Sequence, residues 1–236
     1  MPTPAQAHFM RATAAAESSA AAEDNPLALA TGYELMLHKL ATDRRRLKEV
    51  QSMELKAELK RELLPEYVPY VEGVLAAGTG VQDDVLMTVL IWRIDAGDGK
   101  GAMEIARYAI AHQLSLPDQY QRTTSTLIAE EFADAAKRTR DGGSPVDASA
   151  LKDVLELTMG QDMPDQVRAK LHKEIGLSLS LSIGEQPLTN EGLEIGNTAL
   201  EHMKRAMELN DKVGIKKEIQ KLERELKNAT TSSAGS

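Results

Sequence analysis

The chain has 236 residues and a mass of 25.7 kDa, more than one average domain and less than two. Hydrophobic residues make up 42% and charged residues 27%, as in an ordinary globular protein, and no uncharged apolar run approaches the roughly 18 residues of a membrane-spanning helix. Cysteine is absent, which excludes disulfides and cysteine-ligated metal centres. Aromatic residues are only 3%, so the core must consist of Leu, Ile, Val, Met and Ala. This composition, with a net charge of −8, predicts an all-α protein.

Residues 1–28 are expected to form an arm that is separate from the core. Thr3 and Gln6 have the spacing of a capping box, and an Ala-rich helix can then run to about Ala22, before Asn25-Pro26 breaks it. The segment has no long apolar region of the kind found in targeting signals. It also has little apolar surface to bury, so we expect this helix to be mobile until a partner binds it.

The longest predicted element covers residues 31–64. Apolar residues recur there at helical spacings from Tyr33 to Leu47 and beyond, and no proline intervenes before Pro65. At about 1.5 Å per residue, such a helix would span roughly 50 Å, longer than a helix packed inside a small domain needs to be. It is therefore a candidate oligomer seam. Two shorter helices with a bend near Asp43 fit the same pattern equally well.

The same segment is basic within an acidic chain. Residues 39–61 contain eight basic and four acidic side chains. The basic residues are Lys39, Arg44, Arg45, Arg46, Lys48, Lys56, Lys60 and Arg61. Arg44, Arg45 and Arg46 have too few acidic neighbours to be neutralised locally, which predicts a phosphate contact. Residues 54–61 read more simply as a solvated helix face with ion pairs.

Residues 65–112 form the most apolar part of the chain, and the run from 81 to 94 within it predicts a buried central helix. Asp83 and Asp84 lie at its start, whereas Asp95 and Asp98 follow its end. Paired carboxylates can hold Mg²⁺ for phosphodiester cleavage, but these two pairs would be separated by about 16 Å of helix. We therefore favour a structural role, and Asp83 and Asp84 remain weak catalytic candidates.

The rest of the chain predicts further helices. They cover residues 102–111, 127–140, 147–160 and 164 onward, with a linker at 141–145 and a last hairpin at 189–209 and 212–227. Helical pairs of this kind allow packing like that of tetratricopeptide repeats. We divide the chain into the arm at 1–28, an all-helical core at 29–180, a C-terminal hairpin at 185–227 and a disordered tail at 228–236.

Residues 177–183 present a conflict, because Leu or Ile alternates strictly with Ser, which is a strand pattern. No second run of this kind is available to pair with it, and a lone strand would leave its backbone groups unpaired. We therefore expect a helix that continues from residue 165.

Motifs for several kinds of chemistry are missing from the sequence. It contains no phosphate-binding Gly-x-x-x-x-Gly-Lys-Ser/Thr loop, no His-Glu-x-x-His zinc motif and no Gly-x-Ser-x-Gly nucleophile motif. The five histidines are scattered. We therefore expect no metal site or cofactor in this chain and no ATP hydrolysis by a P-loop.

Several strings in the chain together resemble one known family, in the same order. They are Thr-Pro-Ala-Gln at 3–6, Met10-Arg11, Glu-Leu-Lys-Ala at 54–57, Lys-Arg-Glu-Leu-Leu-Pro at 60–65, Gln-Asp-Asp-Val-Leu-Met-Thr-Val at 82–89, Trp-Arg-Ile-Asp-Ala-Gly-Asp at 92–98, Glu-Ile-Ala-Arg-Tyr-Ala at 104–109, Asp-Met-Pro-Asp at 162–165, Val-Arg-Ala-Lys-Leu-His-Lys at 167–173 and Lys-Lys-Glu-Ile at 216–219. The chain resembles the gpM-type small terminase subunit of temperate contractile-tailed phages, also called the terminase endonuclease subunit. The sequence departs from that pattern at 178–192 and in its tail. The resemblance implies a basic tail, but residues 228–236 are neutral here, which argues against DNA binding by the tail.

The resemblance implies a role in DNA packaging in the host bacterial cytoplasm. Such a subunit binds the cohesive-end site of double-stranded phage DNA as a ring-like homo-oligomer and recruits a large subunit that carries the ATPase motor, ATP and Mg²⁺. Under this interpretation residues 31–64 form the oligomer seam and residues 185–227 bind the large subunit. Arg11 joins the eight basic residues above as a candidate DNA contact.

The family name assigns endonuclease activity to this subunit, although the residues form no evident nuclease site. We therefore expect it to direct cleavage that its partner carries out. Two alternatives stay open: a metal-dependent DNA endonuclease in its own right, and a helical-repeat scaffold that binds only proteins.

Overall fold

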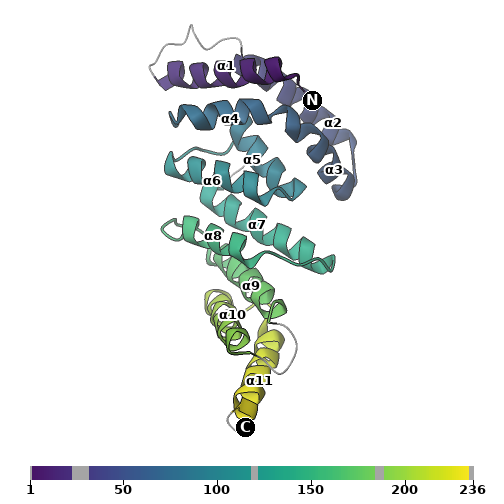
Figure 1. Cartoon of the computed structure of the whole chain (residues 1–236), viewed down its shortest axis with the longest axis vertical. Helices are drawn as coiled ribbons and strands as arrows, with labels where there is room; N and C mark the ends of the chain where they lie inside the picture. The colour runs from purple at the N-terminus through teal and green to yellow at the C-terminus, as the bar shows by residue number, and fades with distance from the viewer. Residues whose placement is uncertain (1, 23–31, 118–121, 184–188, 234–236) are drawn as a thin grey trace. The chain divides into compact units, whose positions relative to one another are not determined.

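The computed structural model describes residues 2–22, 32–117, 122–183 and 189–233, and the regular structure in these ranges is entirely helical (Figure 1). This confirms the predicted all-α fold. None of the helices described is both long and apolar enough to cross a lipid bilayer. The chain divides into two compact units, residues 1–124 and 125–236. The division falls inside the core that we predicted for residues 29–180, so that boundary was wrong.

The N-terminal unit is built around a helix that is buried on all sides. Its elements are α1 (Pro4–Ala22), α2 (Gly32–Glu49), α3 (Met53–Leu63), the 3₁₀ turn η2 (Leu64–Glu66), α4 (Val68–Ala77), α5 (Asp84–Ala96) and α6 (Gly99–Ala111). Every residue from Val85 to Trp92 is buried, which confirms the predicted central helix. Helices α2, α3 and α6 pack around α5.

Helix α1 begins with the predicted capping box. The amide of Thr3 donates to Gln6 Oε1 at 2.8 Å, and the amide of Gln6 donates to Thr3 Oγ1 at 3.3 Å. Contrary to our expectation of a separate arm, α1 packs against α4 within the unit (Figure 1). A glycine permits this close approach, because a Cβ atom at Gly73 would lie 2.8 Å from the Cβ of Ala14.

The continuous helix predicted for residues 31–64 is absent, because α2 and α3 are separate helices. The alternative with two helices is confirmed, but the interruption lies at residues 50–52 and not near Asp43. Ser52 has an extended backbone (φ −65°, ψ 129°), and its hydroxyl accepts a hydrogen bond from the amide of Leu55, as a helix N-cap does. The helix of roughly 50 Å on which we based the expected oligomer seam is therefore replaced by two shorter helices.

The C-terminal unit is also helical. Its elements are α7 (Thr124–Asp141), α8 (Ala148–Thr158), α9 (Asp165–Leu181), α10 (Asn190–Leu209) and α11 (Lys216–Ser233). The helical interpretation of residues 177–183 is confirmed as far as Leu181, where α9 ends. The hairpin is confirmed as α10 and α11, but α11 continues to Ser233, so residues 228–233 are helical and not a disordered tail.

Helix α9 packs between α8 and α10. A glycine again sets the spacing, since a Cβ at Gly176 would lie 2.7 Å from Met203 Cγ and 2.9 Å from the carbonyl oxygen of Ala199. Met203 and Ala199 are completely buried in this contact. The α9–α10 seam is therefore tightly packed along its centre.

Candidate nucleic-acid interface

The nine predicted DNA contacts all lie in the N-terminal unit, on α1, α2 and α3. The structure does not bring them together into one basic face, because several already bind other parts of the unit.

Lys39 belongs to a polar network inside the unit. Its ammonium lies 2.8 Å from Asp43 Oδ2, 2.7 Å from Glu66 Oε2 and 4.8 Å above the centre of the Tyr67 ring. Burial lowers the pKa of Lys39, but hydrogen bonds to the two carboxylates outweigh that effect and the pKa is raised. Lys39 therefore stabilises the fold and is poorly available to a phosphate group.

The three consecutive arginines point in different directions, as neighbours on a helix must. Arg44 donates to the buried hydroxyl of Thr88 on α5 at 2.6 Å. Arg46 lies 3.5 Å from Asp43 Oδ1 with 52% of its side chain exposed. Arg45 is exposed and, among the residues described, donates to Thr42 on its own helix alone, at 3.1 Å. The cluster therefore does not form a single triple-arginine contact.

Lys60 and Arg61 attach α3 to the end of α5. Lys60 forms a half-buried ion pair with Asp95, and Arg61 Nε donates to the carbonyl oxygen of Ala96 at 2.9 Å. Cations are favoured at a helix C-terminus because they satisfy its last carbonyl groups and the negative end of its dipole. On α1, Arg11 pairs with Glu72 at 3.1 Å near the surface.

Three of the predicted contacts have neither an ion pair nor a hydrogen bond to another element, within the part of the chain that the structure describes. They are Arg45 and Lys48 at the end of α2 and Lys56 at the start of α3, which we call the α2–α3 cations. Arg45 and Lys48 are exposed, and Lys56 is half-exposed. Met53 and Leu55 on α3 are also exposed, by 72% and 54%. The region on both sides of residues 50–52 can thus offer phosphates cations that no carboxylate occupies.

Asp83 and Asp84, the weak catalytic candidates, lie at the start of α5. Asp83 is 6% exposed, and its two oxygens accept hydrogen bonds from the amide of Leu86 at 2.8 Å and from the hydroxyl of Tyr70 at 2.6 Å. Burial is the main cause of its raised pKa. Asp84 is half-exposed and accepts a long hydrogen bond from Gln82. Asp83 therefore acts as a helix cap, and its oxygens are already occupied.

The carboxylates at the other end of α5 are also engaged. Asp98 accepts from the amide of Gly101 at 2.9 Å and pairs with Arg93 at 3.3 Å, while Asp95 binds Lys60. Among the residues described, no three or more His, Asp or Glu side chains form a group that could hold a metal ion.

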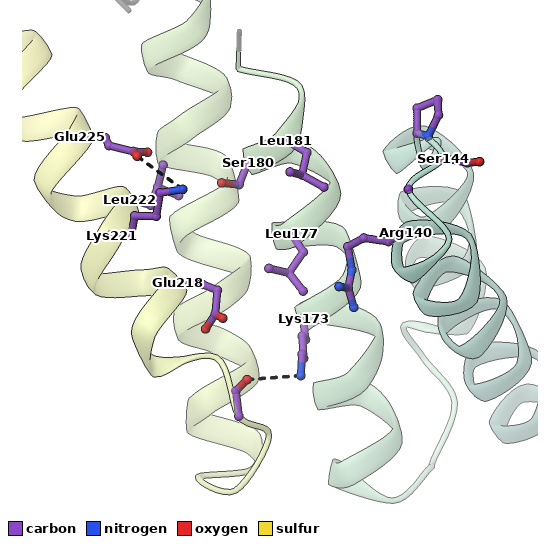
Figure 2. Close-up of a pocket in the computed structure, with 13 residues that line it drawn as sticks. Arg140, Ser144, Lys173, Leu177, Ser180, Leu181, Glu218, Lys221, Leu222 and Glu225 are labelled. Carbon is purple, nitrogen blue, oxygen red and sulfur yellow. Dashed lines mark hydrogen bonds and ion pairs between the residues drawn. The ribbon is translucent and has the colours of Figure 1, made fainter. Parts of the chain in front are cut away.

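A groove of about 680 Å³ lies in the C-terminal unit, between the end of α7, α9 and α11 (Figure 2). Its apolar lining includes Leu177, Leu181 and Leu222. Its charges are largely compensated: Arg140 binds the buried Glu174 at 3.1 Å, and Lys221 lies 3.8 Å from Glu225. Such a balanced groove is more typical of a protein contact than of a polyphosphate contact.

Sequence reasoning missed one pair of residues in this unit. His172 on α9 and His202 on α10 are in direct contact, although they lie thirty positions apart in the sequence. No spacing rule signals such a pair, because it depends on how α9 and α10 pack.

The comparisons with known proteins agree on one family. The family described as "Phage small terminase subunit" matches residues 37–166, more than half of the chain. The protein named "Terminase, endonuclease subunit" of Escherichia phage P2 is 50% identical over 227 residues, which cover 96% of this chain and 87% of that protein. The "Probable terminase, endonuclease subunit" of Haemophilus phage HP1 is 25% identical over 170 residues, which cover 70% of this chain and 60% of that protein.

No solved structure gives a significant match to this chain. The family match and the P2 relative establish the family without a matching solved structure, and they agree with the resemblance seen in the sequence. The chain belongs to the phage small terminase subunit family.

Proposed function

We propose that this protein is the DNA-recognition subunit of a phage packaging terminase. It binds the cohesive-end site of double-stranded phage DNA inside the host bacterium, as a ring-like homo-oligomer, and directs a large ATPase subunit to that site. The observation that carries the proposal is the 50% identity over 96% of the chain with a protein named as a terminase subunit.

The α2–α3 cations are the DNA contact in this proposal. Arg45, Lys48 and Lys56 remain accessible while Lys39, Arg44 and Lys60 bind their own unit. Three cations per subunit form a weak site alone. An oligomer repeats them around the assembly, so that many phosphate contacts add up despite the net charge of −8.

The DNA contact is tested by salt-dependent binding of a cohesive-end duplex to the full-length protein. The triple variant R45A/K48A/K56A is compared with K137A/K216A/K217A, which removes three exposed cations from the C-terminal unit and causes the same change in net charge. We expect the first variant to bind at least tenfold more weakly, with a salt dependence reduced by roughly one phosphate contact per lost cation. Equal losses in both variants would contradict the assignment.

The groove of Figure 2 is the surface that we propose for the large subunit. Leu181 is 69% exposed beside this groove, whereas Met159, in the same unit, is 66% exposed and does not line it. L181D should therefore weaken capture of the purified large subunit at least tenfold, while M159D leaves it unchanged. If both variants bind the large subunit like the wild type, the groove is not the docking surface.

The printed names of the relatives favour a second candidate, a metal-dependent DNA endonuclease in its own right. In our proposal the large subunit supplies Mg²⁺ and ATP. The missing P-loop motif in this chain supports this for ATP, and the hydrogen bonds to both oxygens of Asp83 support it for Mg²⁺. Incubation of cohesive-end DNA with Mg²⁺ and ATP, with each purified subunit and with both, distinguishes the two. If this subunit alone nicks the DNA and the D84N variant does not, the subunit is itself a nuclease.

A further inference from the structure

Two histidine rings meet across the seam between α9 and α10. His172 Nδ1 and His202 Nδ1 are 2.9 Å apart, and the ring centres are 5.1 Å apart with planes inclined at 37°. Both side chains are half-buried. The contact is therefore a hydrogen bond between the two Nδ1 atoms.

The histidine pair lies in the contact that joins the C-terminal hairpin, α10 and α11, to α9. Helix α10 is the partner of both α9 and α11, and its contact with α9 is close at Gly176 and Met203. His202 immediately precedes Met203 in α10. Any repulsion between the two rings therefore acts directly on the seam that holds the hairpin to the rest of the unit.

The hydrogen bond holds one proton. One ring must carry a hydrogen on Nδ1, and the other must accept with an unprotonated Nδ1. A first additional proton can be taken up at Nε2 of the donor ring without breaking the contact. A second additional proton must bind Nδ1 of the acceptor ring. Two positively charged rings then point their Nδ1–H groups at each other across 2.9 Å, with no acceptor between them.

The charges around the pair oppose its protonation. Burial is the main factor that lowers the pKa of His172 to about 4, followed by His202, Arg205 and Arg168. Burial also lowers the pKa of His202, with Lys152 on α8 acting in the same direction and Glu201 on α10 against it. Within the described residues, α11 adds no charge to this set.

We propose that His172 and His202 form a proton-sensitive latch that holds the α10–α11 hairpin on α9 near neutral pH and releases it in acid. This device goes beyond the proposed DNA-packaging role and does not depend on it. Since the pKa of each folded histidine lies below its ordinary 6.5, the stabilisation is complete above pH 6.5 and decreases as the pH falls toward 4.

Hydrogen exchange of α10 tests the latch in the full-length protein. After correction for intrinsic exchange, opening of α10 should increase roughly tenfold between pH 7 and pH 5.5. The double variant H172Q/H202Q should lose this pH dependence, because an amide can hydrogen bond but does not titrate in this range. H38Q, which removes an exposed histidine on α2, should behave like the wild type. A pH response that persists in the double variant would overturn the proposal.

Nitrogen NMR of histidine-labelled wild-type protein gives an independent test that needs no variant. At neutral pH one of the two rings must show the Nδ1–H tautomer, which free histidine populates less than Nε2–H. Finding the Nε2–H tautomer on both rings would exclude the hydrogen bond and with it the latch.

Discussion

Tyr67 donates its hydroxyl proton to Asp43 Oδ2 across 2.7 Å, and both side chains are buried. Lys39 and Arg46 bind the same carboxylate, and Trp92 on α5 meets the Tyr67 ring edge-on at 5.8 Å between centres. The charged part of α2 is thereby tied to the core of the N-terminal unit. Part of the basic segment that the sequence offers as a DNA contact thus binds a buried carboxylate of its own unit.

Replacing Asp43 with Ala should strongly destabilise the N-terminal unit. The change leaves the hydroxyl of the buried Tyr67 without its acceptor and leaves the half-buried ammonium of Lys39 with Glu66 alone. A buried polar group left without its partner costs about 1–3 kcal/mol, and the lost charge interactions of Asp43 add to this cost. Trp92 is the single tryptophan and lies beside Tyr67, so urea unfolding followed by its fluorescence reports on this unit.

The matched variant Y67F removes one hydrogen bond and keeps the ring. It should lower the free energy of unfolding by about 1 kcal/mol. If D43A unfolds at the same urea concentration as the wild type, the network does not contribute to stability. Lys39 would then again be a candidate DNA contact.

Gly73→Val should displace α1 from α4, because the added side chain would overlap the backbone and Ala14 of α1. We expect amide exchange in α1 to increase at least tenfold while α5 stays protected. A76V adds the same side chain at an exposed position of α4 and should leave α1 unchanged. Equal protection of α1 in both variants would contradict the packing described.

The sequence predicts features that depend on neighbouring residues. The capping box of Thr3 and Gln6 and the buried run after Asp83 are of this kind, and the structure confirms both. Contacts between distant residues were not predictable. Lys60 binds Asp95, which lies thirty-five positions away in the sequence. The sequence therefore predicts a solvent-exposed charge at Lys60, because the pairing depends on how α3 packs against α5.

The ion pair with Asp95 gives Lys60 a different role from Lys56, which lies four positions earlier on the same helix. K60M should lower the free energy of unfolding of the N-terminal unit by about 1.5–3 kcal/mol, the usual range for a hydrogen bond to a charged group. K56M should change it by less than about 0.5 kcal/mol, as for most surface positions. Affinity for cohesive-end DNA should show the opposite order, with K56M the weaker binder. If K60M instead weakens DNA binding without loss of stability, the structural role of Lys60 is wrong.

Asp147 caps α8, where its Oδ1 accepts from the amide of Ser149 at 2.8 Å and from its hydroxyl at 2.7 Å. D147A should cost about 1 kcal/mol, which corresponds to roughly fivefold faster opening of α8 in hydrogen exchange. D147N keeps an acceptor oxygen and should retain most of the protection. The hydrogen bonds from Ser149 lower the pKa of Asp147 below its usual 3.8, so the charge contributes fully above pH 3.8 and less as the pH falls below it. The difference in α8 opening between wild type and D147A should therefore become smaller as the pH falls below 3.8. A difference in opening that becomes larger in acid would mean that the carboxylate is not the cap.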